Sequence, residues 1–142
     1  QASIKIIDAG NQSLASFKFY ALMLYKDSSN SLFWIVWEGE LRSLYGEYAF
    51  GTEVGTALTY DPDVHKYIRI REASGTVYWD YSTNGKSWTN HSSIANPFAV
   101  TSLEVDLGIR STAEASTTTA KVDDFNILPS AVILTNVRYM ES

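Results

Sequence analysis

The sequence predicts an all-β fold, a two-sheet antiparallel β-sandwich, on two observations. Apolar and polar residues alternate with a period of two along several short segments, and turn residues interrupt the chain at short intervals. Between Lys66 and Arg71, for example, Ile68 and Ile70 alternate with larger polar side chains, so the two sets lie on opposite faces of a strand. No long segment shows the 3.6-residue period of an amphipathic helix, and we therefore expect negligible helix.

Turn residues divide the chain into short segments that predict its strands in order. The strands before the central hairpin are Ser3 to Ile7, Ser16 to Lys26, Leu32 to Trp37, Leu41 to Phe50 and a weaker one at Gly51 to Thr59. The hairpin itself consists of Lys66 to Arg71 and Thr76 to Tyr81, and the last clear strands are Ser102 to Ile109 and Thr119 to Leu128. We expect one β-sandwich domain over residues 1–128. Residues 129–142 are then an extra strand, or an arm that connects the domain to a parent protein.

Length, charge and composition narrow the class of protein. A chain of 142 residues can bury about 68–70% of the surface that its unfolded state exposes, which is enough for one stable core. The absence of cysteine excludes disulfides and cysteine-ligated zinc. A net charge of −5 argues against a nucleic-acid partner, which would need a clustered excess of Lys and Arg. No apolar run reaches the roughly 18 residues of a membrane-spanning helix, so the sequence predicts no membrane insertion.

The order of the central motifs is similar to that of a known family. The motifs begin with an arginine-bearing strand, a glycine turn, an aromatic strand and Ser-Thr-Asn-Gly-Lys-Ser-Trp at 82–88. Leu107-Gly108-Ile109 and the segment from Val122 to Ile127 follow them. From Ser16 to Leu128 this order resembles the concanavalin A-like lectin/glucanase domains. The resemblance implies a jelly roll whose concave outer face often holds sugar. Domains of this kind occur in bacterial surface proteins and in bacteriophage tails, including enlarged distal tail proteins, which implies an extracellular or virion-associated location.

An aromatic and charged surface is the predicted functional site. Sugars present apolar CH patches and many hydroxyl groups, so a site for them combines aromatic rings with groups that bond to two hydroxyls at once. Such side chains project from one face of the central hairpin, namely Tyr67, Arg69, Arg71, Tyr78 and Asp80. We expect Trp34, Trp37 and Tyr45 to join them from neighbouring strands, although one of the two tryptophans belongs to the core. The alternative is that the Arg and Asp residues form only a salt-bridge ladder on the surface.

Two carboxylates on one strand raise the alternative of a glycoside hydrolase. Glu104 and Asp106 lie two residues apart and share a strand face, with their Cα atoms about 6–7 Å apart. The jelly-roll glucanases that the chain resembles use a Glu-x-Asp-x-Glu strand, and Gly108 stands here at the third acidic position. The sequence therefore predicts no catalytic residue and no enzymatic activity.

Asp123 and Asp124 suggest a calcium site, because calcium binds several oxygen ligands. Adjacent residues of a strand point to opposite faces, so such a site needs a further ligand, for which Asp27 or Asp8 are candidates. We expect no cofactor and no bound metal, with calcium as the open alternative.

The segment Ser82 to Trp88 also resembles the Asp-box hairpin of sialidases, with Asn84 in place of Asp. We expect a structural turn that the Asn84 side chain holds, with Trp88 packed beneath it. His65 and His91 lack metal-ligand spacing and are expected in solvated loops.

Together these observations predict a non-catalytic carbohydrate-binding module that mediates adhesion to a cell-surface polysaccharide or oligosaccharide. Host recognition by a phage tail is the specific example that the resemblance implies. The alternative is a structural or protein-interaction domain of a larger assembly.

Overall fold

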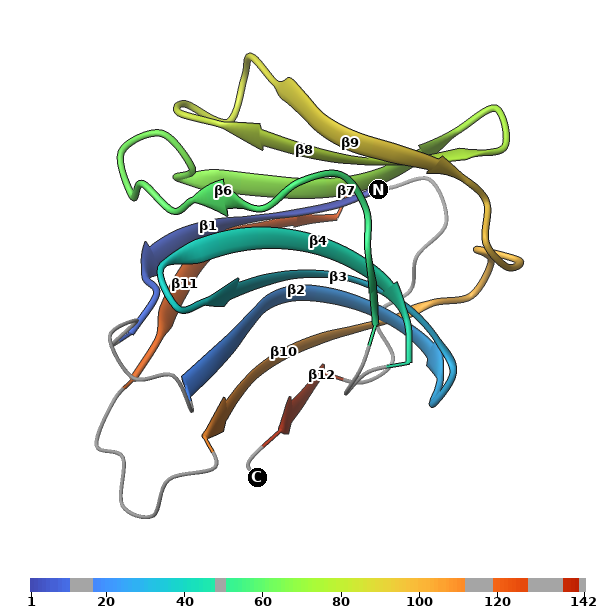
Figure 1. Cartoon of the computed structure of the whole chain (residues 1–142), viewed down its shortest axis with the longest axis horizontal. Coiled ribbons are helices and arrows are strands. Elements are labelled where there is room, and N and C mark those ends of the chain that lie inside the picture. Colours follow the sequence, from blue (N-terminus) through green and yellow to red (C-terminus); the bar gives the residue numbers. More distant parts are fainter. Residues whose placement is uncertain (11–16, 48–50, 112–118, 128–136, 141–142) are drawn as a thin grey trace.

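The computed structural model describes residues 1–10, 17–47, 51–111, 119–127 and 137–140. These residues form two β-sheets packed face to face (Figure 1), and no helix that could cross a membrane occurs among them. The predicted all-β sandwich of two antiparallel sheets is confirmed. The jelly-roll connectivity that the resemblance implies stays a prediction.

The smaller sheet contains the predicted central hairpin. Its strands are all antiparallel and follow the order β11 (Lys121–Ile127), β1 (Ala2–Asp8), β7 (Tyr67–Ala73), β8 (Thr76–Ser82) and β9 (Thr89–Ala95). A two-residue turn joins β7 to β8, with φ values of 53° at Ser74 and 79° at Gly75. Positive φ at both central residues is the requirement of a type I′ turn, whose twist matches that of a hairpin.

The larger sheet has the remaining strands and a curved shape. Their order is β12 (Val137–Met140), β10 (Glu104–Ser111), β2 (Phe17–Asp27), β3 (Asn30–Trp37), β4 (Glu40–Gly46) and β5 (Thr52–Glu53), with β6 (Leu58–Thr59) also beside β4. Only the β10–β12 pair is parallel among the pairs described. The outer face of this sheet, turned away from the smaller sheet, is concave (Figure 1).

Two segments form strands other than those predicted. Thr89–Ala95 forms β9, although its small polar residues show no alternation. Gly51 to Thr59 holds two strands of two residues each instead of one strand, and a φ of 81° at Gly55 lies between them. Of the C-terminal segment 129–142, the described residues Val137–Met140 add a strand to the larger sheet, which is one of the two alternatives predicted for this segment.

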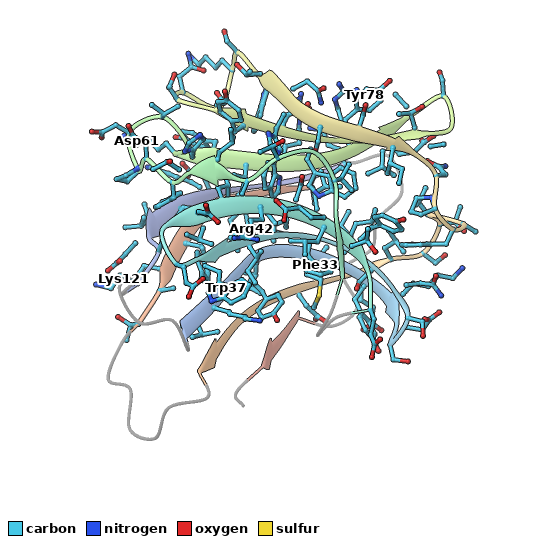
Figure 2. All side chains as sticks on the ribbon, in the orientation of Figure 1. Phe33, Trp37, Arg42, Asp61, Tyr78 and Lys121 are labelled. Atoms are coloured by element: carbon cyan, nitrogen blue, oxygen red, sulfur yellow. The ribbon has the colours of Figure 1, made fainter. Side chains whose placement is uncertain are left out.

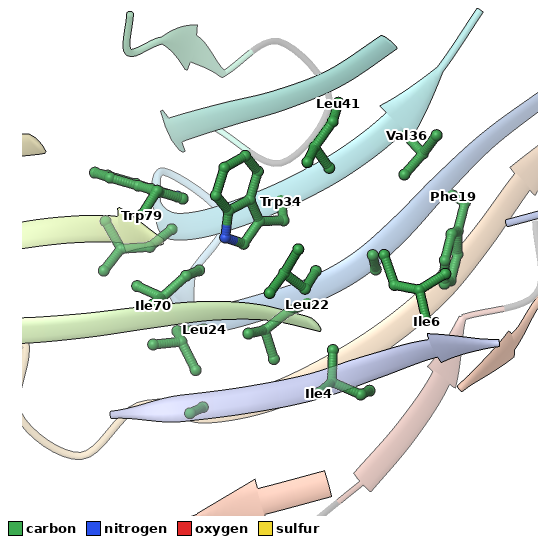
Figure 3. Packing of buried hydrophobic residues seen from close by; sticks show 14 of the residues in the cluster. Ile4, Ile6, Phe19, Leu22, Leu24, Trp34, Val36, Leu41, Ile70 and Trp79 are labelled. Carbon is green, nitrogen blue, oxygen red and sulfur yellow. The ribbon is translucent and has the colours of Figure 1, made fainter. Parts of the chain in front are cut away.

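The main core lies between the two sheets. Inward-facing side chains of β1, β2, β3, β7 and β8 fill it, and Trp34 and Trp79 are its largest members, each 0% exposed (Figure 3). A second, smaller apolar cluster lies on the outer face of the larger sheet. It consists of Tyr20, Met23, Phe33 and Ile35, with Tyr25, Trp37 and Leu44 packed against it.

Candidate functional site

The predicted hairpin residues do share one surface, the outer face of the smaller sheet. In the register of β7 and β8, Arg69 lies opposite Asp80, and Arg71 lies opposite Tyr78. Ile68 and Ile70 point the other way and are buried in the core. Period-two alternation therefore assigned the faces of this hairpin correctly.

Asp80 is the centre of a network of charge-assisted hydrogen bonds on this face. Its Oδ2 accepts from Arg69 Nε at 2.9 Å, from Arg69 Nη2 at 2.6 Å and from Arg71 Nε at 2.7 Å. Asn90 Nδ2 donates to the other carboxylate oxygen at 3.0 Å. The Asp80 side chain is only 1% exposed, so the two guanidinium groups and the amide replace the water that a buried carboxylate loses.

The pKa of Asp80 reflects this balance. Burial alone would raise the pKa of its carboxyl group. The hydrogen bonds from Asn90, Arg71 and Arg69, together with the charge of Arg69, outweigh burial and lower the pKa below the ordinary value of an aspartate. The carboxylate is therefore ionised at neutral pH and tied to both arginines.

Aromatic rings close this network at both ends. The Trp88 ring stacks on the Arg69 guanidinium, with its centroid 4.2 Å from Arg69 Cζ, and the Tyr78 ring lies 4.0 Å from Arg71 Cζ. We call this row, in which three charged groups of alternating sign lie between two rings, the Asp80 ladder; its members are Trp88, Arg69, Asp80, Arg71 and Tyr78. Figure 2 shows Tyr78 on the outer side of the smaller sheet. The ladder corresponds to the alternative that the sequence left open, a salt-bridge ladder across the strands.

A hollow of about 310 Å³ lies beside the ladder. We call it the Tyr67 hollow; Ser3, Tyr67, Gly85, Trp88, Asp124 and Phe125 line it. These residues come from β1, from β7, from the loop after β8 and from β11. The Tyr67 hydroxyl group donates to Asp124 Oδ2 over a long 3.5 Å, and Lys5 Nζ lies 3.7 Å from the same oxygen. Three aromatic side chains and the exposed carboxylate of Asp124 thus meet at one concave spot.

The loop that forms one wall of the hollow is held by its own side chains. Asn84 Oδ1 accepts from the amides of Lys86 and Ser87 at 2.8 and 2.9 Å, and Ser82 Oγ accepts from the Gly85 amide at 2.9 Å. This confirms the structural turn predicted around Asn84. Trp88 at its end stacks on Arg69 and lines the hollow, a role that sequence reasoning missed.

A β-bulge in β11 forms the other wall. The pairing of β11 with β1 shifts next to Lys5, which lies opposite Asp123, and φ at Asp124 is 48°. Val122 and Phe125 both pack against the core, so Asp123 and Asp124 between them are both exposed. The expectation that these two carboxylates point to opposite faces is wrong, because the extra residue of the bulge breaks the alternation.

The carboxylates named for calcium are engaged locally instead of meeting at one point. Asp27 accepts from the Asn30 amide group and from the Ser29 backbone amide, and Asp8 accepts from the Gly10 amide. Within the described ranges, no three His, Asp or Glu side chains come together as a metal site would require.

Trp34, Trp37 and Tyr45 do not join the hairpin face, and this expectation is wrong because β3 and β4 belong to the other sheet. Trp34 is the core tryptophan, and Tyr45 packs against the same core. Trp37 lies on the outer face of the larger sheet (Figure 2), where its ring centroid is 4.1 Å from Lys18 Nζ and 5.3 Å from Arg42 Cζ.

Glu104 and Asp106 also belong to the larger sheet. Asp106 is 3% exposed, and Glu104 is half-buried. Asp106 lies opposite Met23, which belongs to the apolar cluster on the outer face of that sheet. A buried carboxylate beside apolar side chains is not placed like a catalytic acid that a polysaccharide can reach.

Both histidines lie in the structure differently from the solvated loops expected. His65 is 5% exposed, its Nδ1 accepts from the Asp61 amide at 3.0 Å, and the Tyr81 ring lies edge-on at 4.8 Å. His91 lies in β9, 5.4 Å from the Trp34 ring. Burial lowers the pKa of both imidazoles, and the charge of Asp61 only partly opposes this at His65.

A larger hollow, of about 500 Å³, opens at one end of the sandwich. Aliphatic side chains such as Leu24, Val77 and Leu103 line it, with Arg71 and Glu72, and none of its lining residues is aromatic. It therefore lacks the ring surface that suits a sugar, which the Tyr67 hollow has.

Comparisons of the chain with protein-family models, with curated proteins and with solved structures found no match.

Proposed function

We propose that this domain is a non-catalytic carbohydrate-binding module and that the Tyr67 hollow is its binding site. The observation that carries the proposal is the meeting of Tyr67 and Trp88 with the exposed carboxylate of Asp124. Aromatic rings pack against the CH faces of sugars, and a carboxylate accepts strong hydrogen bonds from hydroxyl groups. Lys5 adds a donor at the same edge. The resemblance to concanavalin A-like lectin domains favours the same class of ligand by analogy.

In this proposal the Asp80 ladder holds the site in place. Arg69 and Arg71 already bind Asp80, and Trp88 stacks on Arg69. The ladder thus fixes the ring of Trp88 before a ligand arrives, which lowers the entropy lost on binding. Of the hairpin residues predicted from the sequence, Tyr67 is the one proposed to contact the sugar.

Such a site would bind one glycan weakly, because the hollow is small and open. An assembly with many copies of the domain gains strength through avidity, since each further contact is intramolecular. This is the physical basis for proposing adhesion to a cell-surface polysaccharide, with a phage tail or a bacterial surface protein as the parent assembly.

The experiment compares two tryptophan variants, Trp88→Ala and Trp37→Ala, which lie on different sheets. Affinity electrophoresis in gels with cell-wall polysaccharides from candidate host bacteria measures binding, and circular dichroism checks the fold. We expect Trp88→Ala to weaken binding about tenfold or more, because the sugar loses its contact with an aromatic ring. Trp37→Ala should bind like the parent.

The opposite result, with binding lost only in Trp37→Ala, would move the site to the concave face of the larger sheet. If the parent chain binds no polysaccharide at all, the alternative is favoured, a structural or protein-interaction domain whose outer face is covered by another subunit. Glycoside hydrolase activity is the third class and is tested separately below.

A further inference from the structure

The charges around the Tyr67 hollow limit the sugars that it can hold. We infer that the hollow takes a single terminal pyranose ring without negative charge, neutral or amino-bearing, and that Asp124 is the side chain that selects it. This inference rests on the proposed function and names the ligand class of that same site.

The cations that contact the lining side chains are already engaged. Arg69 directs both Nε and Nη2 to Asp80, and the Trp88 ring covers one face of its guanidinium group. Lys5 lies 3.7 Å from Asp124. An anionic sugar is usually bound by an arginine fork, and Arg69 could provide one only by leaving Asp80 as a buried, poorly paired charge.

Asp124 presents the opposite chemistry to the hollow. Its side chain is 56% exposed, and Tyr67 and Lys5 both contact its Oδ2 atom. Among the described residues, therefore, none donates to Asp124 Oδ1, which can accept from ligand hydroxyl groups. The neighbouring Asp123 is also exposed and adds a second negative charge. A uronate, sialate or phosphate group would meet this charge, whereas hydroxyl and ammonium groups would be bound by it.

The backbone at Asp124 supports a selecting role. Its φ of 48° lies in the left-handed region, which is unfavourable for any residue other than glycine. The surrounding bulge holds Asp124 in this conformation. The bulge leaves both carboxylates exposed, and that of Asp124 lies within reach of the Tyr67 hydroxyl group. A regular strand would turn one of them toward the core.

The size of the hollow limits the ligand to one ring. Its volume of about 310 Å³ lies at the lower end of the ~300–1,000 Å³ that ligand sites occupy. The loop with Gly85 and Trp88 bounds one side, and Asp124 with Phe125 bounds the other. A chain end fits between such walls more readily than an internal residue of a polysaccharide.

The test is an array of glycans that end in neutral hexoses, N-acetylhexosamines, hexosamines, hexuronic acids or sialic acid. The parent chain is compared with Asp124→Asn and with a matched control, Asp123→Asn, which removes the same charge one residue away. We expect the parent to prefer uncharged and amino-bearing ends by about tenfold or more, as one charge-assisted hydrogen bond allows. Asp124→Asn should lose about tenfold of that binding and discriminate less against acidic ends. Asp123→Asn should keep most of the binding and most of the discrimination against acidic ends.

Free methyl glycosides of the preferred end sugar then test the size. They should compete with the array glycan about as well per molecule as short oligosaccharides do. A preference for acidic ends, an unchanged preference in Asp124→Asn, or competition by long chains alone would each overturn the inference while the binding function stands. A parent chain that binds none of the glycans rejects the proposed function and this inference with it.

Discussion

Trp34 and Trp79 each donate a hydrogen bond across the core to the main chain of the opposite sheet. The indole N–H of Trp34 in β3 donates to the main-chain carbonyl of Arg69 in β7 at 3.0 Å, and that of Trp79 in β8 donates to the carbonyl of Phe33 in β3 at 3.2 Å. A buried indole N–H needs an acceptor, and each tryptophan finds it in the opposite sheet. The two bonds therefore fix the hairpin that carries the Asp80 ladder against the larger sheet.

Replacement of Trp79 by Phe tests this link. The variant keeps an aromatic side chain but loses the bond to Phe33 and part of the buried volume, so the free energy of unfolding should fall by about 2 kcal/mol. Urea denaturation measures the change. Trp37→Phe, at a half-buried position on the outer face, serves as the control and should change stability much less. Equal losses in the two variants would contradict the role assigned to the cross-sheet bond.

Asp80 should make the fold sensitive to strong acid. Its hydrogen bonds from Asn90, Arg71 and Arg69 lower the pKa of the carboxyl group in the folded state despite burial. The stability that it contributes is therefore complete above the unfolded pKa of about 3.9 and is lost as the pH falls through the lower folded pKa.

Asp80→Asn should cost about 3 kcal/mol at neutral pH, because both arginines lose a buried counter-charge. Urea midpoints measured against pH should show a shallower acid loss in this variant than in the parent. If the urea midpoints of Asp80→Asn and the parent fall in parallel with pH, Asp80 is not the cause of the acid sensitivity.

The two histidines should affect stability at a milder pH. Burial lowers the pKa of His65 and of His91, and the charge of His65 lowers that of His91 further. As the pH falls below the unfolded value of about 6.5, the unfolded chain binds protons that the folded state does not, so stability falls.

Nuclear magnetic resonance titration of the imidazole protons should give both pKa values below 6.5. The double variant His65→Gln/His91→Gln should lose less stability than the parent between about pH 7 and about pH 5.5, after its lower starting stability is taken into account. Values at or above 6.5 would show that the imidazoles are hydrated in solution.

The sequence was informative wherever local alternation decides the outcome. Ile68 and Ile70 against Arg69 and Arg71 predicted both the strand and its faces, because side chains of a strand alternate by geometry alone. The same rule failed at Asp124, where a bulge inserts a residue that no local pattern announces.

Long-range pairing explains the other failures. Trp37 shows the same alternation whichever sheet β3 joins, so its separation from Tyr67 could not be read from the chain. β9 is a strand because it pairs with the edge of β8, not because Thr89–Ala95 has strand character of its own. Trp88 belongs to the candidate site because it stacks on Arg69. This contact joins the loop after β8 to β7, and no local sequence pattern predicts it.

Catalysis offers a direct negative prediction. Incubation with β-glucans or bacterial wall polysaccharides should release no new reducing ends, because Asp106 is closed off from solvent and Gly108 occupies the third acidic position. A reducing-sugar assay measures this. Hydrolysis by the parent chain that disappears in Glu104→Gln would contradict the prediction and establish a glycoside hydrolase.

Two glycines provide a matched pair for the wall of the Tyr67 hollow. Gly85 and Gly75 both have positive φ, 72° and 79°, but only a Cβ at Gly85 meets a neighbour, the Tyr67 ring at 3.2 Å. Each change to Ala should cost about 1–2 kcal/mol for the left-handed backbone. Gly85→Ala should cost more and also weaken glycan binding, because the loop and the Tyr67 ring must move apart. Urea denaturation and affinity electrophoresis measure the two effects, and undiminished binding by Gly85→Ala would place the sugar outside this hollow.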